Sequence, residues 1–153
     1  MKKSFTMIEL VFVIIILGIL AAVAIPKLFA TRDDAIITKV RTDVSTIRSA
    51  ISNLHTKNLM KGLNSYPEAL DDANTDEDEE LFDGNESIGY LLEYPIYSKN
   101  ADGHWMKVDD TNYTVKIMDT TIKFNYYPNN GHFDCKNINS EDKAKELCKK
   151  LTH

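Results

Sequence analysis

The first part of the chain is an unbroken apolar run. Residues Leu10 to Ile25 carry no charge, and within the longer segment Phe5 to Ile25 the one ionisable side chain is Glu9. As a helix, this segment would span roughly 32 Å, which is close to the hydrocarbon thickness of a bilayer. Because Lys2 and Lys3 precede it, the N-terminal end is expected on the cytoplasmic side of a membrane.

A second pattern continues the helix beyond the apolar run. Apolar residues recur at intervals of three and four, at Ile37, Val40, Val44, Ile47, Ile51 and Leu54. This spacing predicts an amphipathic helix with one buried face. The face could pair with another copy as a coiled coil, but the strands predicted downstream make a sheet of the same chain its expected partner. Gly62 and Pro67 end the pattern, so we expect one helix from about Phe5 to Lys57.

The C-terminal part has the alternating pattern of half-buried strands. It predicts an antiparallel meander with strands at 104–108, 113–118 and 121–127 and turns at 109–112 and 119–120. We interpret residues 88–97 as a short helix followed by a strand, and Ser140 as the cap of a last helix that ends near Leu151. The predicted fold class is α+β: a long N-terminal helix packed on a small antiparallel sheet, with a short C-terminal helix.

Composition and motifs reduce the number of function classes that the chain could belong to. The chain has 153 residues, 27% of them charged, and a formal net charge of −5. A chain this acidic has no general attraction to phosphate backbones, so direct nucleic-acid binding is not expected. The histidines lack metalloprotease spacing, and there is no phosphate-binding loop or nucleophile elbow. We therefore expect no enzyme activity.

Calcium is the cofactor that the sequence suggests as a candidate. The segment from Asp71 to Glu86 is strongly acidic, and hard cations prefer carboxylate and carbonyl oxygens. The spacing of these acids does not match an EF-hand loop. A solvated acidic loop without a metal is the favoured interpretation, and a calcium site is the alternative.

The two cysteines, Cys135 and Cys148, lack the C-x-x-C spacing of zinc and redox sites. In an oxidising compartment such a pair usually forms one disulfide, whereas in the cytosol free thiols are more common. The compartment of the C-terminal part therefore decides between the two.

Glu9 matters for interpreting the apolar run. A cleaved secretory signal would have a shorter apolar core followed by small residues, which Ala21 to Ala24 imitate. A plain membrane anchor fits the length. Neither accounts for a carboxylate inside the span, which costs roughly 2.5 to 3.5 kcal/mol at a helix centre and less near the interface. Such a residue normally has a partner.

The segment Ser4-Phe5-Thr6-Met7-Ile8-Glu9-Leu10 resembles the prepilin cleavage and methylation motif of type IV pilins and type II secretion pseudopilins. In that family a dedicated peptidase cuts on the cytoplasmic side, and the new N-terminal residue, usually Phe, is N-methylated. The resemblance implies a cut between Ser4 and Phe5, which makes Glu9 the fifth residue of the mature chain and Pro26 the twenty-second. The family usually has Gly where this chain has Ser4.

The resemblance also implies a division of the chain and a location. The parts would be a leader (1–4), a transmembrane and filament-core helix (5–26), an amphipathic stalk helix (27–60) and a periplasmic globular domain (61–153). The protein would be a single-pass protein of the bacterial inner membrane, with a cytoplasmic N-terminus, and would later enter a filament. A periplasmic domain implies a disulfide between Cys135 and Cys148.

The residues that would serve assembly are Glu9, Gly18, Ala22 and Pro26. Glu9 would neutralise the N-terminal amine of a neighbouring subunit, which offsets the desolvation of both charges. Gly18 and Ala22 lie four residues apart, a spacing that permits close helix contact in membranes, although an Ala-rich span can contain it by chance. Pro26 would kink or loosen the helix, or mark its exit from the membrane.

These expectations make the protein a structural subunit. Its partners would be like subunits, a prepilin peptidase and an inner-membrane assembly platform driven by a cytoplasmic ATPase. The preferred hypothesis is a type II secretion pseudopilin, and the alternative is a type IV pilin of a surface or DNA-uptake (competence) pilus. A hypothesis of a different class is a membrane-anchored periplasmic binding module that never polymerises. Cleavage by a prepilin peptidase would distinguish the pseudopilin and the pilin from the binding module.

Overall fold

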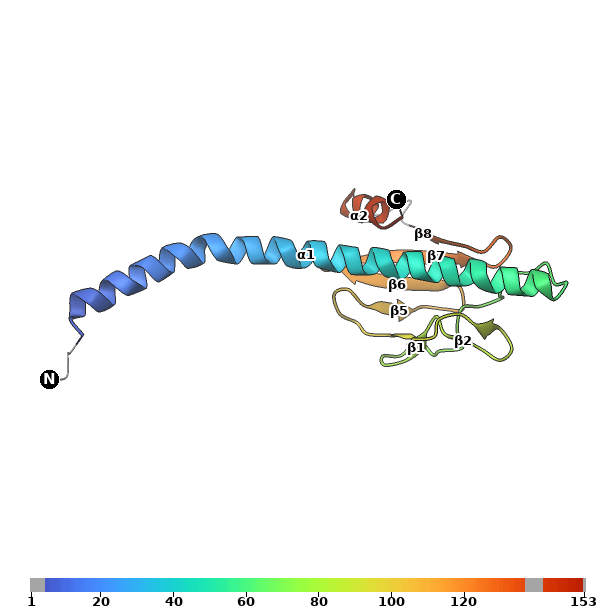
Figure 1. Ribbon diagram of the computed structural model, residues 1–153. Helices are drawn as coiled ribbons and strands as arrows, with labels where there is room; N and C mark the ends of the chain where they lie inside the picture. The colour runs from blue at the N-terminus through green and yellow to red at the C-terminus, as the bar shows by residue number, and fades with distance from the viewer. Residues whose placement is uncertain (1–4, 137–141, 153) are drawn as a thin grey trace. The chain divides into compact units, whose positions relative to one another are not determined.

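The computed structural model describes residues 5–136 and 142–152. The chain divides into two compact units, Met1–Ala35 and Ile36–His153, and helix α1 (Met7–Met60) runs through both. After α1 come a small antiparallel sheet and the short helix α2 (Asp142–Thr152), as Figure 1 shows. The α+β class predicted from the sequence is therefore confirmed. The predicted cap Ser140 lies outside the described residues.

A four-stranded antiparallel sheet forms the centre of the second unit. Its strands follow the chain order, β5 (Trp105–Lys107), β6 (Asn112–Ile117), β7 (Thr120–Tyr127) and β8 (His132–Cys135). The first three confirm the predicted meander, and β8 was not predicted. The turn between β6 and β7 is Met118-Asp119, one residue earlier than expected, and both residues have positive φ, 49° and 60°. Such a pair is typical of a type I′ hairpin turn.

The amphipathic stripe of α1 packs within its own chain. Val40, Val44, Ile47 and Ile51 are buried in one cluster with the inward face of the sheet. That face is largely aromatic: Trp105 and Phe124 meet edge to face with ring centroids 5.0 Å apart, and Phe124 stacks on Phe133 at 5.2 Å. The sheet is therefore the partner of the stripe, as the strand pattern predicted, and not a second helix.

Two short strand pairs precede the main sheet. Strand β1 (Glu80–Leu81) pairs with β4 (Ile96–Tyr97), and β2 (Gly84–Asn85) pairs with β3 (Gly89–Tyr90). The helix predicted within residues 88–97 is wrong. The chain passes through Gly89 with φ of 97°, and a Cβ there would lie 2.7 Å from Leu54 of α1. The close approach to α1 and the left-handed backbone both favour glycine at this point.

The acidic segment does not remain wholly in solvent, because its first residue is part of the core. Asp71 has a side chain that is 0% exposed, and its Oδ1 lies 2.9 Å from Nζ of Lys107, itself 3% exposed. Its Oδ2 accepts hydrogen bonds from the hydroxyl of Tyr113 (2.9 Å) and the backbone N–H of Phe82 (3.0 Å). The expectation of a solvated loop is therefore wrong for Asp71, which is a buried acid with an ion pair at one carboxylate oxygen and two hydrogen bonds at the other.

Two buried tyrosines should make the unit sensitive to alkali. Burial raises the pKa of Tyr113, and the negative charge of Asp71 beside its hydroxyl adds to this, while burial also raises the pKa of Tyr126. In the unfolded chain both phenols ionise near about pH 10. Their contribution to stability is therefore complete below that pH and is lost as the pH rises above it.

We expect the urea concentration at the unfolding midpoint of the full chain in detergent to decrease as the pH is raised from about 9 to 11. Unfolding is monitored by the fluorescence emission of Trp105. The variant Tyr126→Phe should show a shallower fall. Tyr127→Phe removes an exposed phenol (40%) and is the matched control, so its profile should equal that of the unmodified chain. Equal slopes for Tyr126→Phe and Tyr127→Phe would contradict the assignment.

Candidate functional site

The N-terminal part of α1 is an apolar surface with no cover in the subunit. Every large apolar side chain from Phe5 to Phe29 is at least 40% exposed, and Val23 and Leu28 exceed 70%. The segment is long and apolar enough to cross a membrane. A helix that is apolar all round is stable only where lipid or other apolar helices surround it. This surface is therefore the part of the molecule that requires an external partner.

Glu9 lies at the start of this surface, in the first turn of α1. Its backbone N–H donates to the carbonyl oxygen of Thr6 (3.1 Å) and to Oγ1 of the same threonine (3.3 Å). Thr6 is thus the N-cap, and Thr6-x-x-Glu9 has the sequence of a capping box. We did not predict this role of Thr6, although the spacing was visible in the sequence. Glu9 itself is exposed, and no side chain of residues 5–136 or 142–152 pairs with its carboxylate.

The remaining predicted assembly residues lie farther along the same helix. A Cβ added to Gly18 would meet nothing within 4 Å, so its surface is open to a neighbour, and Ala22 follows one turn later. Pro26 is inside α1, and the helix continues through it to Met60. The proline therefore does not end the helix in the subunit. Phe5 is described and 77% exposed, whereas Ser4 lies outside the described residues.

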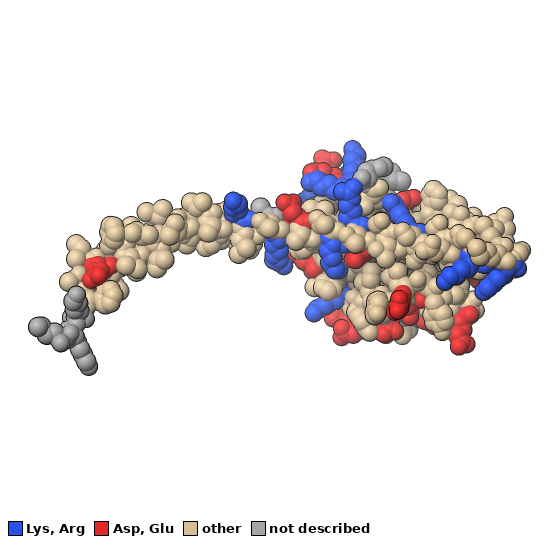
Figure 2. Space-filling view, in the orientation of Figure 1, with Lys and Arg blue, Asp and Glu red and all other residues tan. Residues whose placement is uncertain are grey.

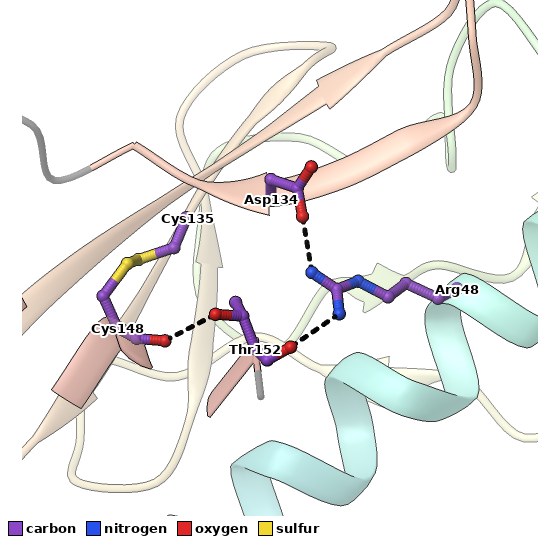
Figure 3. The surroundings of a disulfide bond; sticks show 5 residues. All are labelled: Arg48, Asp134, Cys135, Cys148 and Thr152. Atoms are coloured by element: carbon purple, nitrogen blue, oxygen red, sulfur yellow. Dashed lines mark hydrogen bonds and ion pairs between the residues drawn. A yellow bond between two sulfur atoms is a disulfide. The ribbon is translucent and has the colours of Figure 1, made fainter. Parts of the chain in front are cut away.

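The predicted cysteine pair lies in the second unit. Cys135 at the end of β8 and Cys148 in α2 are joined by a disulfide, with 5.9 Å between their Cα atoms. The bond fixes α2, whose apolar face of Ala144, Leu147 and Leu151 is buried, against the last strand of the sheet (Figure 3).

Arg48 strengthens the same junction from the other side, as Figure 3 shows. Its Nη2 lies 2.5 Å from Oδ1 of Asp134, its Nε donates to the carbonyl of Phe133 (2.9 Å), and its Nη1 reaches the carbonyl of Thr152 (3.5 Å). One guanidinium thus connects α1, β8 and the end of α2. Nothing near Arg48 in the sequence indicates these partners, because they lie 85, 86 and 104 residues away.

The acids of the segment 72–86 serve separate contacts. Glu77 accepts from the backbone N–H of Asn100 (2.9 Å), Glu79 from that of Asn74 (3.2 Å), and Glu80 from the hydroxyl of Tyr97 (2.8 Å). In the part of the chain that the structure describes, no three His, Cys, Asp or Glu side chains gather as metal ligands would. The arrangement therefore gives no geometric support to the calcium alternative.

The predicted residues thus form two features, each in its own unit. Glu9, Gly18, Ala22 and Pro26 lie along an exposed apolar helix, capped by Thr6, that can associate with lipid or with similar helices. The disulfide stabilises the fold of the second unit. A comparison with known proteins finds no matching family model, no matching curated protein and no matching solved structure.

Proposed function

We propose that the chain is a structural subunit of a type IV pilus-like filament, and that it is a pseudopilin of the type II secretion kind. Its apolar N-terminal segment would hold it in the bacterial inner membrane, a prepilin peptidase would cut it before Phe5, and the same segment would then pack in the core of a filament. Its partners would be like subunits and an inner-membrane assembly platform driven by a cytoplasmic ATPase.

The observation that carries the proposal is the exposed apolar helix with one acid near its start. A plain anchor has no need for a carboxylate at Glu9, and capping alone would be met by Thr6. In a bundle of such helices, the carboxylate can meet the free amine that a cut before Phe5 creates. The second half of α1 supports the same function, since its packing on the sheet ties the apolar segment to a folded body.

Processing of the N-terminus tests the proposal directly. The full chain is produced with a prepilin peptidase in bacterial membranes, and the mass of its N-terminal peptide is measured. We expect a chain that starts at Phe5 with an added methyl group, and filaments that contain it. Ser4→Gly should be cut at least as well, and Ser4→Arg should stay uncut, because the site before the cut accepts small side chains.

Two results would contradict the proposal. One is an uncut N-terminus in both the unmodified chain and Ser4→Gly, which would favour a membrane-anchored module. The other is a cut after Ala24, which would identify the segment as a secretory signal.

A further inference from the structure

One segment of the second unit, residues 80–97, combines acids with exposed tyrosines. Tyr94 is 81% exposed, Tyr90 66% and Tyr97 55%. The strand pairs β1–β4 and β2–β3 carry Tyr97 beside Glu80 and place Tyr90 opposite Gly84, next to the segment that contains Glu86 and Glu93. We call these six residues the acidic tyrosine face: Glu80, Glu86, Glu93, Tyr90, Tyr94 and Tyr97.

This face has the chemistry of a surface that binds cations. Residues 72–93 contain nine acidic side chains and no basic one. Tyrosine is enriched at protein interfaces, and its ring attracts the ammonium group of lysine through the cation–π interaction. The expected partner is therefore a lysine-rich surface.

Helix α2 provides such a surface. It contains the lysines Lys143, Lys145, Lys149 and Lys150 against the acids Asp142 and Glu146, and its apolar residues face inward. Lys145 and Lys150 have side chains that are 50% and 52% exposed. The ion pairs within α2 are exposed ones, such as Lys150 with Glu146 at 2.8 Å, which are weak enough to exchange for a partner on another molecule.

The two surfaces lie at opposite edges of the same folded unit. Helix α2 packs on β7 and β8, whereas the segment after β4 joins the other edge, where the backbone N–H of Lys99 donates to the carbonyl of Trp105 in β5. In Figure 2, red side chains are frequent below the sheet, where Figure 1 places β1 and β2, whereas blue and red side chains both lie around α2. One copy therefore cannot pair its own two surfaces.

We propose that the acidic tyrosine face of one copy binds the lysines of α2 on the next copy of this chain. Two different complementary surfaces on opposite edges of a subunit form a head-to-tail contact, which builds an open helical assembly when its rotation does not close into a ring. The inference rests on the proposed function, because it assigns the contact between globular units of the filament. Glu80, Glu86 and Glu93 supply the charge, and the tyrosines supply the contact area.

A zero-length carbodiimide crosslinker tests this contact, because it joins a lysine to a carboxylate only where the two touch. The full chain is isotopically labelled, mixed with unlabelled chain, and reassembled in membranes or micelles at low salt. We expect mixed-label peptides that join residues 80–93 to α2. Glu86→Lys with Glu93→Lys, or Lys145→Glu with Lys149→Glu, should each lower their yield at least about tenfold, since like charges then oppose each other.

Controls separate the contact from general charge effects and from the proposed function. The four substitutions combined should restore the crosslinks, and Lys57→Glu with Lys61→Glu, which makes the same charge change on exposed residues at the end of α1, should leave them unchanged. Cleavage before Phe5 and filament formation are measured on the same samples. Filaments without these crosslinks would overturn the inference and leave the proposed function standing. Crosslinks without cleavage before Phe5 would overturn the proposed function and leave the inference standing. If the Lys57 and Lys61 variant lost as much crosslink yield as the other variants, the inference would also be overturned.

Discussion

Replacing Lys107 with methionine is expected to lower the free energy of unfolding of the second unit by about 3 to 5 kcal/mol, because it leaves a buried carboxylate without its counter-charge. Lys107 Nζ contacts Asp71 at 2.9 Å and donates to the carbonyl of Ala73 at the same distance. Methionine keeps the unbranched shape and most of the length of the side chain, ends one atom earlier, and removes the charge. The expected loss therefore comes from the unpaired Asp71 and not from a cavity.

The measurement is urea unfolding of the full chain in detergent, followed by the emission of Trp105. This residue is the single tryptophan of the chain and is 0% exposed, so its signal reports on the core. Lys99→Met, at an exposed position, is the control and should change the stability by less than about 0.5 kcal/mol. In the double variant Lys107→Met with Asp71→Asn, the amide oxygen can still accept from Tyr113, and most of the loss should be recovered. A similar midpoint for Lys107→Met and Lys99→Met would contradict this account.

Removing the disulfide by the double substitution Cys135→Ser with Cys148→Ser is expected to cost about 3 kcal/mol, the value of the chain-entropy model for a loop of this length. The two cysteines are 13 residues apart in the sequence. The loss should be greatest locally, because α2 packs mainly on β7 and β8 and the guanidinium of Arg48 holds its end.

Hydrogen exchange of backbone amides resolves the local effect. In the double cysteine variant, protection should fall strongly in α2 and only slightly in β6, which is at the centre of the sheet. Adding Arg48→Gln to the variant should release α2 further. Equal loss of protection in α2 and β6 would show that the disulfide stabilises the unit as a whole and would contradict a local role.

The helices and strands could be predicted from the sequence where a pattern of apolar and polar residues repeats. The stripe of α1 repeats over several turns, β6 alternates over its six residues, and β7 alternates up to Phe124, so burial of one face leaves a clear period in the sequence. Strand β8 has four residues with one buried apolar side chain, Phe133, which is too short for a period to appear. The helix predicted near residue 89 failed because apolar content alone does not report the positive φ of Gly89.

Partners that are distant in sequence were not predictable. Asp71 is the first acid of a long acidic run, and its burial depends on Lys107 and Tyr113, which come from two later strands. The junction at Arg48 depends on Asp134, 86 residues away. By contrast, the candidate assembly residues could be predicted from the sequence alone. Glu9 is the one ionisable residue of a long apolar segment, and recognising it does not depend on any partner that is distant in the sequence.

The continuity of α1 has a mechanical consequence for a subunit in a filament. A pulling force on the exposed apolar part of the helix would reach Val40, Val44 and Ile47 through the helix backbone, without crossing a loop. Because residues 36–60 lie along the sheet, as Figure 1 shows, the load would act in shear on many core contacts at once and not peel them apart one by one. Such a fold resists tension with side-chain packing and with the polar contacts that Arg48 makes to β8 and α2.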